Sequence, residues 1–309
     1  MTPQSIALLV SWYGPYPWYF PYFVHTIGFS PTVDFIIVTD NTEEIPNKPI
    51  NLKIVYRTLD ELKEDFSSKL GFRVNIDSPY KLCDFKPAYG FLFQDLIKEY
   101  DFWGHIDLDV VFGDVRGFMT DELLQSHDVI SCRHDYTAGY FTLYRNNEYC
   151  NKLFTKSDAY QTVFSTPENY LFDECGMLTA KVEFNHSATV SKEISRNATI
   201  LNIQNVFQSM TYVVVKAVRD EGLRAYFDLI ILVDGVQGLV RWKEGKVYYK
   251  DMFEVMFYHL FFFKNSCKNK TVFSPMPNEF FFKINEVYEQ LPDTTDKSTY
   301  TYTPPFHIK

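Results

Sequence analysis

The chain has 309 residues and a net charge of −9, with 46% hydrophobic and 22% charged residues. This composition is typical of a folded globular protein and excludes a disordered chain. The acidic balance argues against a nucleic-acid partner, which would need a basic surface. No apolar run approaches the roughly 20 residues of a membrane span. Five cysteines without metal-type spacing indicate reduced thiols in a cytoplasmic protein.

Short apolar runs alternate with helical patterns in the first half of the chain. This alternation predicts an α/β protein with a mostly parallel sheet and helices on its faces. Ligands of such sheets bind beyond the carboxyl ends of the strands. Strands are predicted at 5–13, 33–41, 51–58 and 102–115, helices at 59–71 and 86–100, and a short helix followed by a strand at 121–132.

The second half is less regular. The stretch GLVRWKEGKVYY, 238–249, predicts a hairpin that turns at Glu244 and Gly245. The stretch 278–291 predicts a closing amphipathic helix. The polar, proline-containing tail 292–309 is expected to be loose.

Two carboxylates stand inside the apolar stretch FWGHIDLDVVFGDV. On one strand, Asp107 and Asp109 would point to the same face, because successive side chains alternate. Two such carboxylates repel, and their desolvation is costly unless a cation pairs with them. Mg²⁺ and Mn²⁺ bind carboxylates together with substrate phosphates. The pattern predicts a divalent metal site that receives a diphosphate; the alternative is a pair of turn or cap residues at a strand end.

A buried strand ending in Asp-x-Asp, about a hundred residues into an α/β chain, resembles the nucleotide-sugar glycosyltransferases of the GT-A fold. The stretches SWYGPYPWYFPYFVHTIGFSPTVDFIIVTDN, YKLCDFKPAYG and AGYFTLYRNN resemble segments of bacterial glycosyltransferases that build surface polysaccharide or lipopolysaccharide. The resemblance covers 5–265. It implies a Rossmann-like mixed, mostly parallel sheet flanked by helices, with an irregular C-terminal hairpin and helix portion.

The same resemblance implies a division of the chain. A GT-A glycosyltransferase domain would span 1–265, with a nucleotide-binding half over about 1–115 and an acceptor half over about 116–265. A C-terminal helix and tail, 266–309, would pack on this domain or trail it.

The resemblance also implies a donor site. Three residues after the first strand would line the nucleoside pocket, and Asp40 would reach the base or the ribose. A turn residue within TDN is the alternative for Asp40. Lys86 stands just before a predicted helix, where the helix dipole disfavours a cation; a solvated turn is the alternative there. Gly139 would let a strand backbone approach the donor. The implied donor-binding residues are Ser11, Trp12, Tyr13, Asp40, Asp84, Lys86, Gly139 and Lys264.

Late in the chain, His259 resembles the last metal ligand of many GT-A enzymes, and Lys264 resembles their diphosphate-binding lysine. The alternative for His259 is a core histidine with satisfied hydrogen bonds. The pair Asp173 and Glu174 resembles the acceptor-facing acid, which is a general base in inverting enzymes or an orienting group in retaining ones. The sequence does not choose between these two acids, and an acidic pair at a helix start is the alternative.

Together these features imply a hexosyltransferase-type enzyme that uses Mn²⁺ or Mg²⁺. It would move a sugar from a nucleotide-diphosphate sugar, with UDP-sugar favoured, to a hydroxyl of a glycan or lipid-linked glycan. The expected setting is polysaccharide or lipopolysaccharide synthesis in the cytoplasm, with peripheral contact at the inner face of the membrane. Two alternatives stay open: a haloacid-dehalogenase-like phosphatase with Asp107 as nucleophile, and a non-catalytic glycan-binding or assembly protein.

Overall fold

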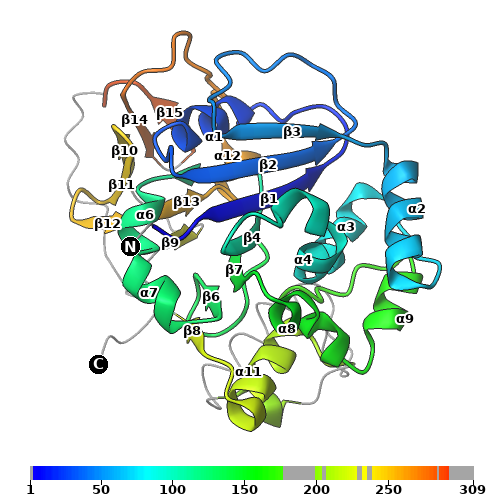
Figure 1. Ribbon diagram of the computed structural model, residues 1–309. Helices are drawn as coiled ribbons and strands as arrows, with labels where there is room; N and C mark the ends of the chain where they lie inside the picture. Colours follow the sequence, from blue (N-terminus) through cyan, green and yellow to red (C-terminus); the bar gives the residue numbers. More distant parts are fainter. Residues whose placement is uncertain are drawn as a thin grey trace.

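The computed structural model describes residues 3–176, 199–203, 207–227, 232–234, 239–283 and 285–291. Within these ranges a seven-stranded sheet runs through the centre, with the strand order β3-β2-β1-β4-β7-β6-β8 (Figure 1). Four of its six neighbouring strand pairs are parallel. The predicted mixed, mostly parallel α/β fold is therefore confirmed. The predicted tail, 292–309, lies outside the described residues.

The central strands are the most apolar part of the sheet. β1 and β2 are near-continuous apolar runs, as expected for strands that are covered on both faces. β1 lies between β2 and β4, so Leu9 pairs with Ile36 on one side and with His105 on the other. The strands are β1 (Ile6–Trp12), β2 (Val33–Thr39), β3 (Leu52–Tyr56), β4 (Phe102–Ile106), β6 (Val129–Ser131), β7 (Phe141–Arg145) and β8 (Ala225–Phe227).

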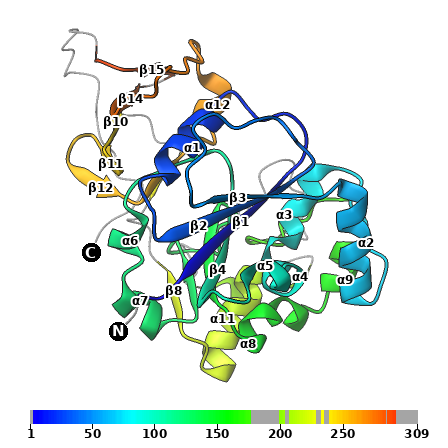
Figure 2. The same ribbon diagram turned by 45° about the horizontal axis from the view of Figure 1, so that its top comes forward.

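Helices cover the two faces of this sheet unequally. Because side chains alternate along β1, Leu8 packs in the core that contains α1, and Leu9 packs in the core that contains the other large helices. Figures 1 and 2 show α2 and α9 together on one side and α1 on the other. The helices and 3₁₀ turns are α1 (Phe20–Ile27), α2 (Leu59–Leu70), η1 (Pro79–Lys81), α3 (Leu82–Phe85), η2 (Lys86–Ala88), α4 (Tyr89–Leu92), α5 (Gln94–Ile97), α6 (Val115–Phe118), α7 (Asp121–Ser126), α8 (Glu148–Asn151), η3 (Leu153–Lys156), α9 (Tyr160–Ser165), η4 (Ile200–Asn202), α11 (Met210–Glu221) and α12 (Phe263–Ser266).

Two smaller sheets complete the described fold. A three-stranded sheet has the order β5-β13-β9, and a five-stranded sheet has the order β12-β11-β10-β14-β15. The indole N–H of Trp242 donates to the Phe112 carbonyl at 2.9 Å and thereby joins the two sheets. Their strands are β5 (Val110–Phe112), β9 (Leu232–Asp234), β10 (Leu239–Lys243), β11 (Lys246–Tyr249), β12 (Phe253–Val255), β13 (Phe257–His259), β14 (Glu279–Lys283) and β15 (Glu286–Tyr288).

Local signals predicted several elements well. The predicted helix at 59–71 is α2, which begins at a Thr58–Glu61 capping box and ends at Gly71 in the left-handed conformation. The predicted hairpin turns at Glu244 and Gly245, between β10 and β11. The five cysteines, all within the described residues, form no disulfide with one another.

Three predictions of regular structure are wrong. The helix at 278–291 is instead the strand pair β14–β15, because Phe280 and Phe282 are buried with the period of two that a strand requires. The helix at 86–100 is broken into η2, α4 and α5, with the chain leaving the helical conformation at Phe93. The strand at 102–115 stops after Ile106 and resumes as β5, so both aspartates lie in the break.

Candidate active site

The candidate site lies at the edge where the parallel strands of the main sheet end. β1 ends at Trp12, β2 at Thr39 and β4 at Ile106, and these three strands run in the same direction. Carboxyl ends of parallel strands are where ligands of such sheets bind. The break after β4 places Asp107 and Asp109 at this edge.

Asp107, Asp109 and His259 form the centre of the site. One ligand atom from each lies within 4.8 Å of the others. His259 reaches the pair because β13 pairs antiparallel with β5, and the Leu260 N–H donates to the Asp109 carbonyl at 2.7 Å. The ring of Tyr140 stacks on the His259 imidazole with 4.1 Å between centroids. Two carboxylates and one imidazole suit a divalent metal ion, so the residues present fit the predicted cofactor.

Two lysines match the two carboxylates. The Lys264 ammonium lies 2.6 Å from Asp109 Oδ2, and the Lys86 ammonium lies 2.6 Å from Asp107 Oδ1. Burial raises the pKa of Asp109, but His259 and Lys264 outweigh it and hold that pKa well below its usual range. Burial favours neutral Lys86, but its carboxylate neighbours, Asp107 above all, raise the pKa of Lys86 well above its usual value. The cluster therefore balances two negative charges with two positive ones.

The predicted acidic pair lies beside this cluster, around Gly139. The Gly139 N–H donates to Glu174 Oε1 at 3.1 Å, and its carbonyl accepts from Lys86 at 2.9 Å. Asp173 Oδ2 lies 3.8 Å from the Lys86 ammonium. Burial raises the pKa of Asp173 and that of Glu174, with Lys86 opposing both rises. A Cβ at position 139 would stand 2.4 Å from Asp173 Oδ2, so glycine is required for this close approach.

The loop after β1 is organised by Asp40. Its carboxylate accepts the Gly14 N–H at 3.0 Å, and Gly14 has a φ of +93°. The Trp12 indole donates to the Pro15 carbonyl at 3.1 Å, and burial raises the pKa of Tyr13. Ser11 is the residue of β1 just before them. The bond from Gly14 to Asp40 agrees with the alternative in which Asp40 is a turn residue. The role of Ser11, Trp12, Tyr13 and Asp40 in nucleoside binding stays a prediction.

Asp84, another predicted donor-binding residue, is bonded away from the cluster. Its side chain is fully buried against Lys81, at 2.9 Å, and it accepts backbone N–H groups from Tyr170 and Phe172. Sequence reasoning expected this carboxylate to face the donor. The structure instead directs it to the segment that carries Asp173.

Sequence reasoning missed several supporting residues. Tyr140 is one of them: it lies in the turn just before β7, and a single aromatic residue there gives no local signal. His105 lies two positions before Asp107, and its Nδ1 is 3.0 Å from the Gly139 carbonyl. Burial, together with Lys86, lowers the pKa of His105 to about 3, which keeps the imidazole neutral. A histidine inside the apolar run FWGHI was the available signal for it.

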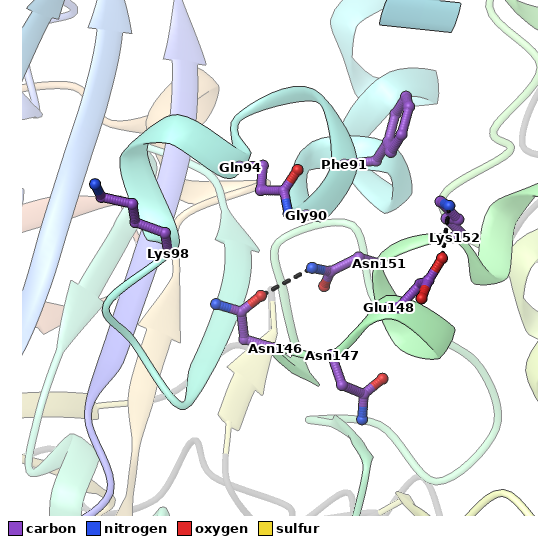
Figure 3. Close-up of a pocket in the computed structure, with 9 residues that line it drawn as sticks. All are labelled: Gly90, Phe91, Gln94, Lys98, Asn146, Asn147, Glu148, Asn151 and Lys152. Carbon is purple, nitrogen blue, oxygen red and sulfur yellow. Dashed lines mark hydrogen bonds and ion pairs between the residues drawn. The ribbon is translucent and has the colours of Figure 1, made fainter.

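A hollow of 420 Å³ lies elsewhere, between α4, α5 and α8 (Figure 3). Its amides already serve the fold: Asn146 donates to the Ile97 and Tyr100 carbonyls, and Asn151 bonds to Asn146. The hollow and the cluster around Asp107 share no residue.

Comparisons with known proteins place the chain in a family. Residues 8–290 match the model of a family described as of unknown function, DUF6625. The chain belongs to this family. Comparison with curated protein sequences gives no match. Within the described residues, no helix is both long and apolar enough to cross a membrane.

Solved structures that match this member of the family are distant. The galactosyltransferase LgtC, solved with donor and acceptor sugar analogs, matches at 10% identity and a TM-score of 0.35, over 75% of this chain and 76% of that chain. Mouse xyloside xylosyltransferase 1 in its apo form matches at 8% identity and a TM-score of 0.42, over 83% of this chain and 96% of that chain. At this distance the likenesses carry no functional argument, which has to come from the site.

Proposed function

We propose that the protein is a metal-dependent glycosyltransferase. It would move a sugar from a nucleotide-diphosphate sugar, with UDP-sugar favoured, to a hydroxyl of a glycan or lipid-linked glycan. The observation that carries this proposal is the convergence of Asp107, Asp109 and His259 beside Lys86 and Lys264, at the carboxyl edge of the sheet. That combination of cation ligands and ammonium groups suits a diphosphate.

The residues divide the work by their chemistry. Asp107, Asp109 and His259 would hold Mn²⁺ or Mg²⁺, which when bound supplies positive charge for the diphosphate and its leaving group. Lys86 and Lys264 are ammonium donors for phosphate oxygens as well as for carboxylates. Lys264 has a side chain that is 25% exposed, so it has room to turn from Asp109 toward a phosphate.

Asp173 and Glu174 would act on the acceptor. In the transfer, a bond forms between the acceptor oxygen and the anomeric carbon, and the bond from that carbon to the diphosphate breaks. The acceptor proton passes to a carboxylate or to water. Burial raises the pKa of both acids, which makes their carboxylates stronger proton acceptors. We propose one of the two for this role, with the other orienting the acceptor.

The setting is part of the same proposal. An acceptor that is a cell-surface polysaccharide or a lipopolysaccharide precursor would be reached in the cytoplasm, with peripheral contact at the inner face of the membrane. The resemblance of SWYGPYPWYF and AGYFTLYRNN to polysaccharide-building enzymes supports this setting.

The first test is a set of thermal melts with UDP, GDP and CMP, each with Mn²⁺ or with EDTA. A ligand at 100 times its Kd adds about 2.7 kcal/mol, which raises Tm by roughly 2–4 °C per kcal/mol in a chain of this size. We expect one nucleotide to stabilise the protein only with metal. The stabilisation should be lost in Asp109→Asn and kept in Asp77→Asn, whose side chain is exposed.

No shift with any nucleotide would contradict the proposal. Metal-dependent release of phosphate from simple phosphoesters would then favour the phosphatase alternative. Sugar binding that does not need metal would favour a glycan-binding protein.

A further inference from the structure

Lys81 and Asp84 form an ion pair that is closed off from solvent. Both side chains are 0% exposed, and Lys81 Nζ lies 2.9 Å from Asp84 Oδ2. The same ammonium donates to the Val163 carbonyl at 2.6 Å and to the Glu168 carbonyl. Its three N–H groups thus bind three acceptors, two of which belong to the segment that leads toward the acidic pair.

The carboxylate of Asp84 holds the next part of that segment. It accepts the Tyr170 N–H at 2.9 Å and the Phe172 N–H at 2.9 Å. Hydrogen bonds from backbone N–H groups to an ionised carboxylate are stronger than neutral ones, more so in an apolar interior. Phe85 and Phe164 stack at 4.2 Å between centroids within the core that surrounds this contact. Asp84 therefore fixes the backbone directly before Asp173.

The turn that follows needs such support. Leu171 has a φ of +54°, an uncommon conformation for a residue with a side chain, which costs about 1–2 kcal/mol. Its carbonyl accepts the N–H groups of Glu174 at 3.1 Å and Gly176 at 2.9 Å, which closes the turn. A strained turn keeps its shape only when the surrounding structure determines it.

Two threonines hold the turn from the other side. Thr137 Oγ1 donates to the Asp173 carbonyl at 2.9 Å, and Thr211 Oγ1 donates to the Glu174 carbonyl at 2.7 Å. The Thr137 N–H also donates to Thr211 Oγ1 at 3.0 Å, which ties the two threonines together. The backbone of both acids is thus fixed between the threonine pair and the Lys81–Asp84 pair.

We propose that the Lys81–Asp84 pair is a positioning device that sets the Asp173–Glu174 turn against Gly139 and the Lys86 ammonium. This inference rests on the proposed function, in which these two acids face the acceptor. Lys81 and Asp84 would touch neither donor nor acceptor. They would set the turnover rate through the place of the turn, because a displacement of about 1 Å costs on the order of 100-fold in rate.

The test compares two double variants of similar volume, K81M/D84N and K81M/D84L. Neither has a buried charge, and they differ in whether residue 84 can accept the Tyr170 and Phe172 N–H groups. A third variant, Asp128→Leu, removes a carboxylate at the other edge of the sheet that pairs with Arg145 and Arg224 and also accepts the Arg224 N–H. It is the control for lost stability without a contact to the turn.

Two measurements decide the matter. In hydrogen exchange, the amides of 170–176 should exchange about ten-fold faster in K81M/D84L than in K81M/D84N. In transfer assays, kcat should fall by on the order of 100-fold in K81M/D84L, with an unchanged KM for the donor and unchanged binding of UDP with Mn²⁺. K81M/D84N should keep near-native kcat, and Asp128→Leu should lose stability only.

Equal exchange and equal kcat in the two double variants would overturn the inference. A parallel fall of kcat in Asp128→Leu would overturn it as well, because lost stability alone would then explain the effect. Failure of the proposed function is separate: it would show as no binding of UDP with Mn²⁺ by the unaltered protein. In that case the hydrogen-exchange comparison of the two double variants still tests whether the Lys81–Asp84 pair positions the turn.

Discussion

Asp84 and Asp107 are both carboxylates with a lysine partner, yet the structure uses them in opposite ways. Asp84 is 0% exposed and is bonded to one ammonium and two backbone N–H groups. Asp107 is 33% exposed and bonded to the Lys86 ammonium at a strand end. A buried carboxylate whose acceptor sites are taken by backbone N–H groups holds the fold, whereas a carboxylate that is partly exposed at a strand end can also reach a ligand. The following predictions test this contrast.

The largest effect is expected on transfer activity, at the cluster of Asp107, Asp109 and His259. Asp109→Asn should lower transfer by on the order of 1,000-fold, because it removes a ligand of the proposed metal site. The free energy of unfolding should fall by about 1–3 kcal/mol, because the buried Asp109 loses its pairing with His259 and Lys264, although Lys264 can turn to water. Turnover and urea unfolding measure the two quantities. A loss of transfer below about ten-fold would show that the cluster has another role.

At Asp84, the free energy of unfolding should change more than the rate of transfer does. Asp84→Asn should lower the free energy of unfolding by about 3–5 kcal/mol, because Lys81 then stays buried without a counterion. Adding Lys81→Met should restore most of the loss, since a neutral pair of similar volume replaces the ions. Urea unfolding of the single and double variants measures this. A single variant as stable as the unaltered protein would mean that the pair is not buried as described.

Gly139 lies between the Asp173–Glu174 turn and the Lys86 ammonium, so its substitution should affect both turnover and stability. Gly139→Ala places a Cβ 2.4 Å from Asp173 Oδ2 and 3.2 Å from Glu174 Oε1. We expect kcat to fall roughly 10- to 100-fold and stability to fall by about 1–3 kcal/mol, with binding of UDP and Mn²⁺ retained. The control is Gly71→Ala, where φ is +76° and the Cβ meets open space. If both variants lose kcat equally, the contact with the acids is not the cause.

The smallest effect is expected on stability at Asp128, a partly exposed carboxylate that pairs with Arg145 and Arg224. Burial raises the pKa of Asp128, but Arg224 and Arg145 outweigh it and lower the pKa to about 2. A carboxylate with a lowered pKa stabilises the fold above its unfolded value of about 3.9 and loses that contribution as pH falls through about 2. Asp128→Asn should therefore cost about 1 kcal/mol at pH 7. The difference should vanish between pH 4 and pH 2 in urea unfolding, and a difference independent of pH would rule out the charge as its source.

Much of the fold could be predicted because its signals are local. The apolar runs of β1 and β2, the capping box and glycine of α2, and the turn at Gly245 are each contained in a few neighbouring residues. The Asp107–Asp109 pair was predicted from a short motif, and Lys86 and His259 from the family resemblance; the structure brings these side chains together.

The remainder depends on partners far along the chain. The strand breaks at Asp107 because β5 pairs with β13, about 150 positions later, and no local pattern reports that pairing. Asp84 could not be assigned because its N–H donors, at Tyr170 and Phe172, lie more than 80 positions away. The stretch FFFK has no alternation of apolar and polar residues, so the burial of Phe280 and Phe282 with a period of two could not be predicted from it, and the longer apolar spacing favoured a helix there.

The contact between Lys264 and Asp109 spans 155 positions of the chain. During synthesis on a ribosome the amino-terminal strands emerge and pair first, and long-range contacts form late. While those 155 positions are being added, the nascent chain would carry Asp107 and Asp109 without the segment that brings His259 and Lys264 to them. The proposed metal and diphosphate site would therefore be complete only after this segment has left the ribosome, and a polypeptide that ends before His259 would lack two members of the cluster.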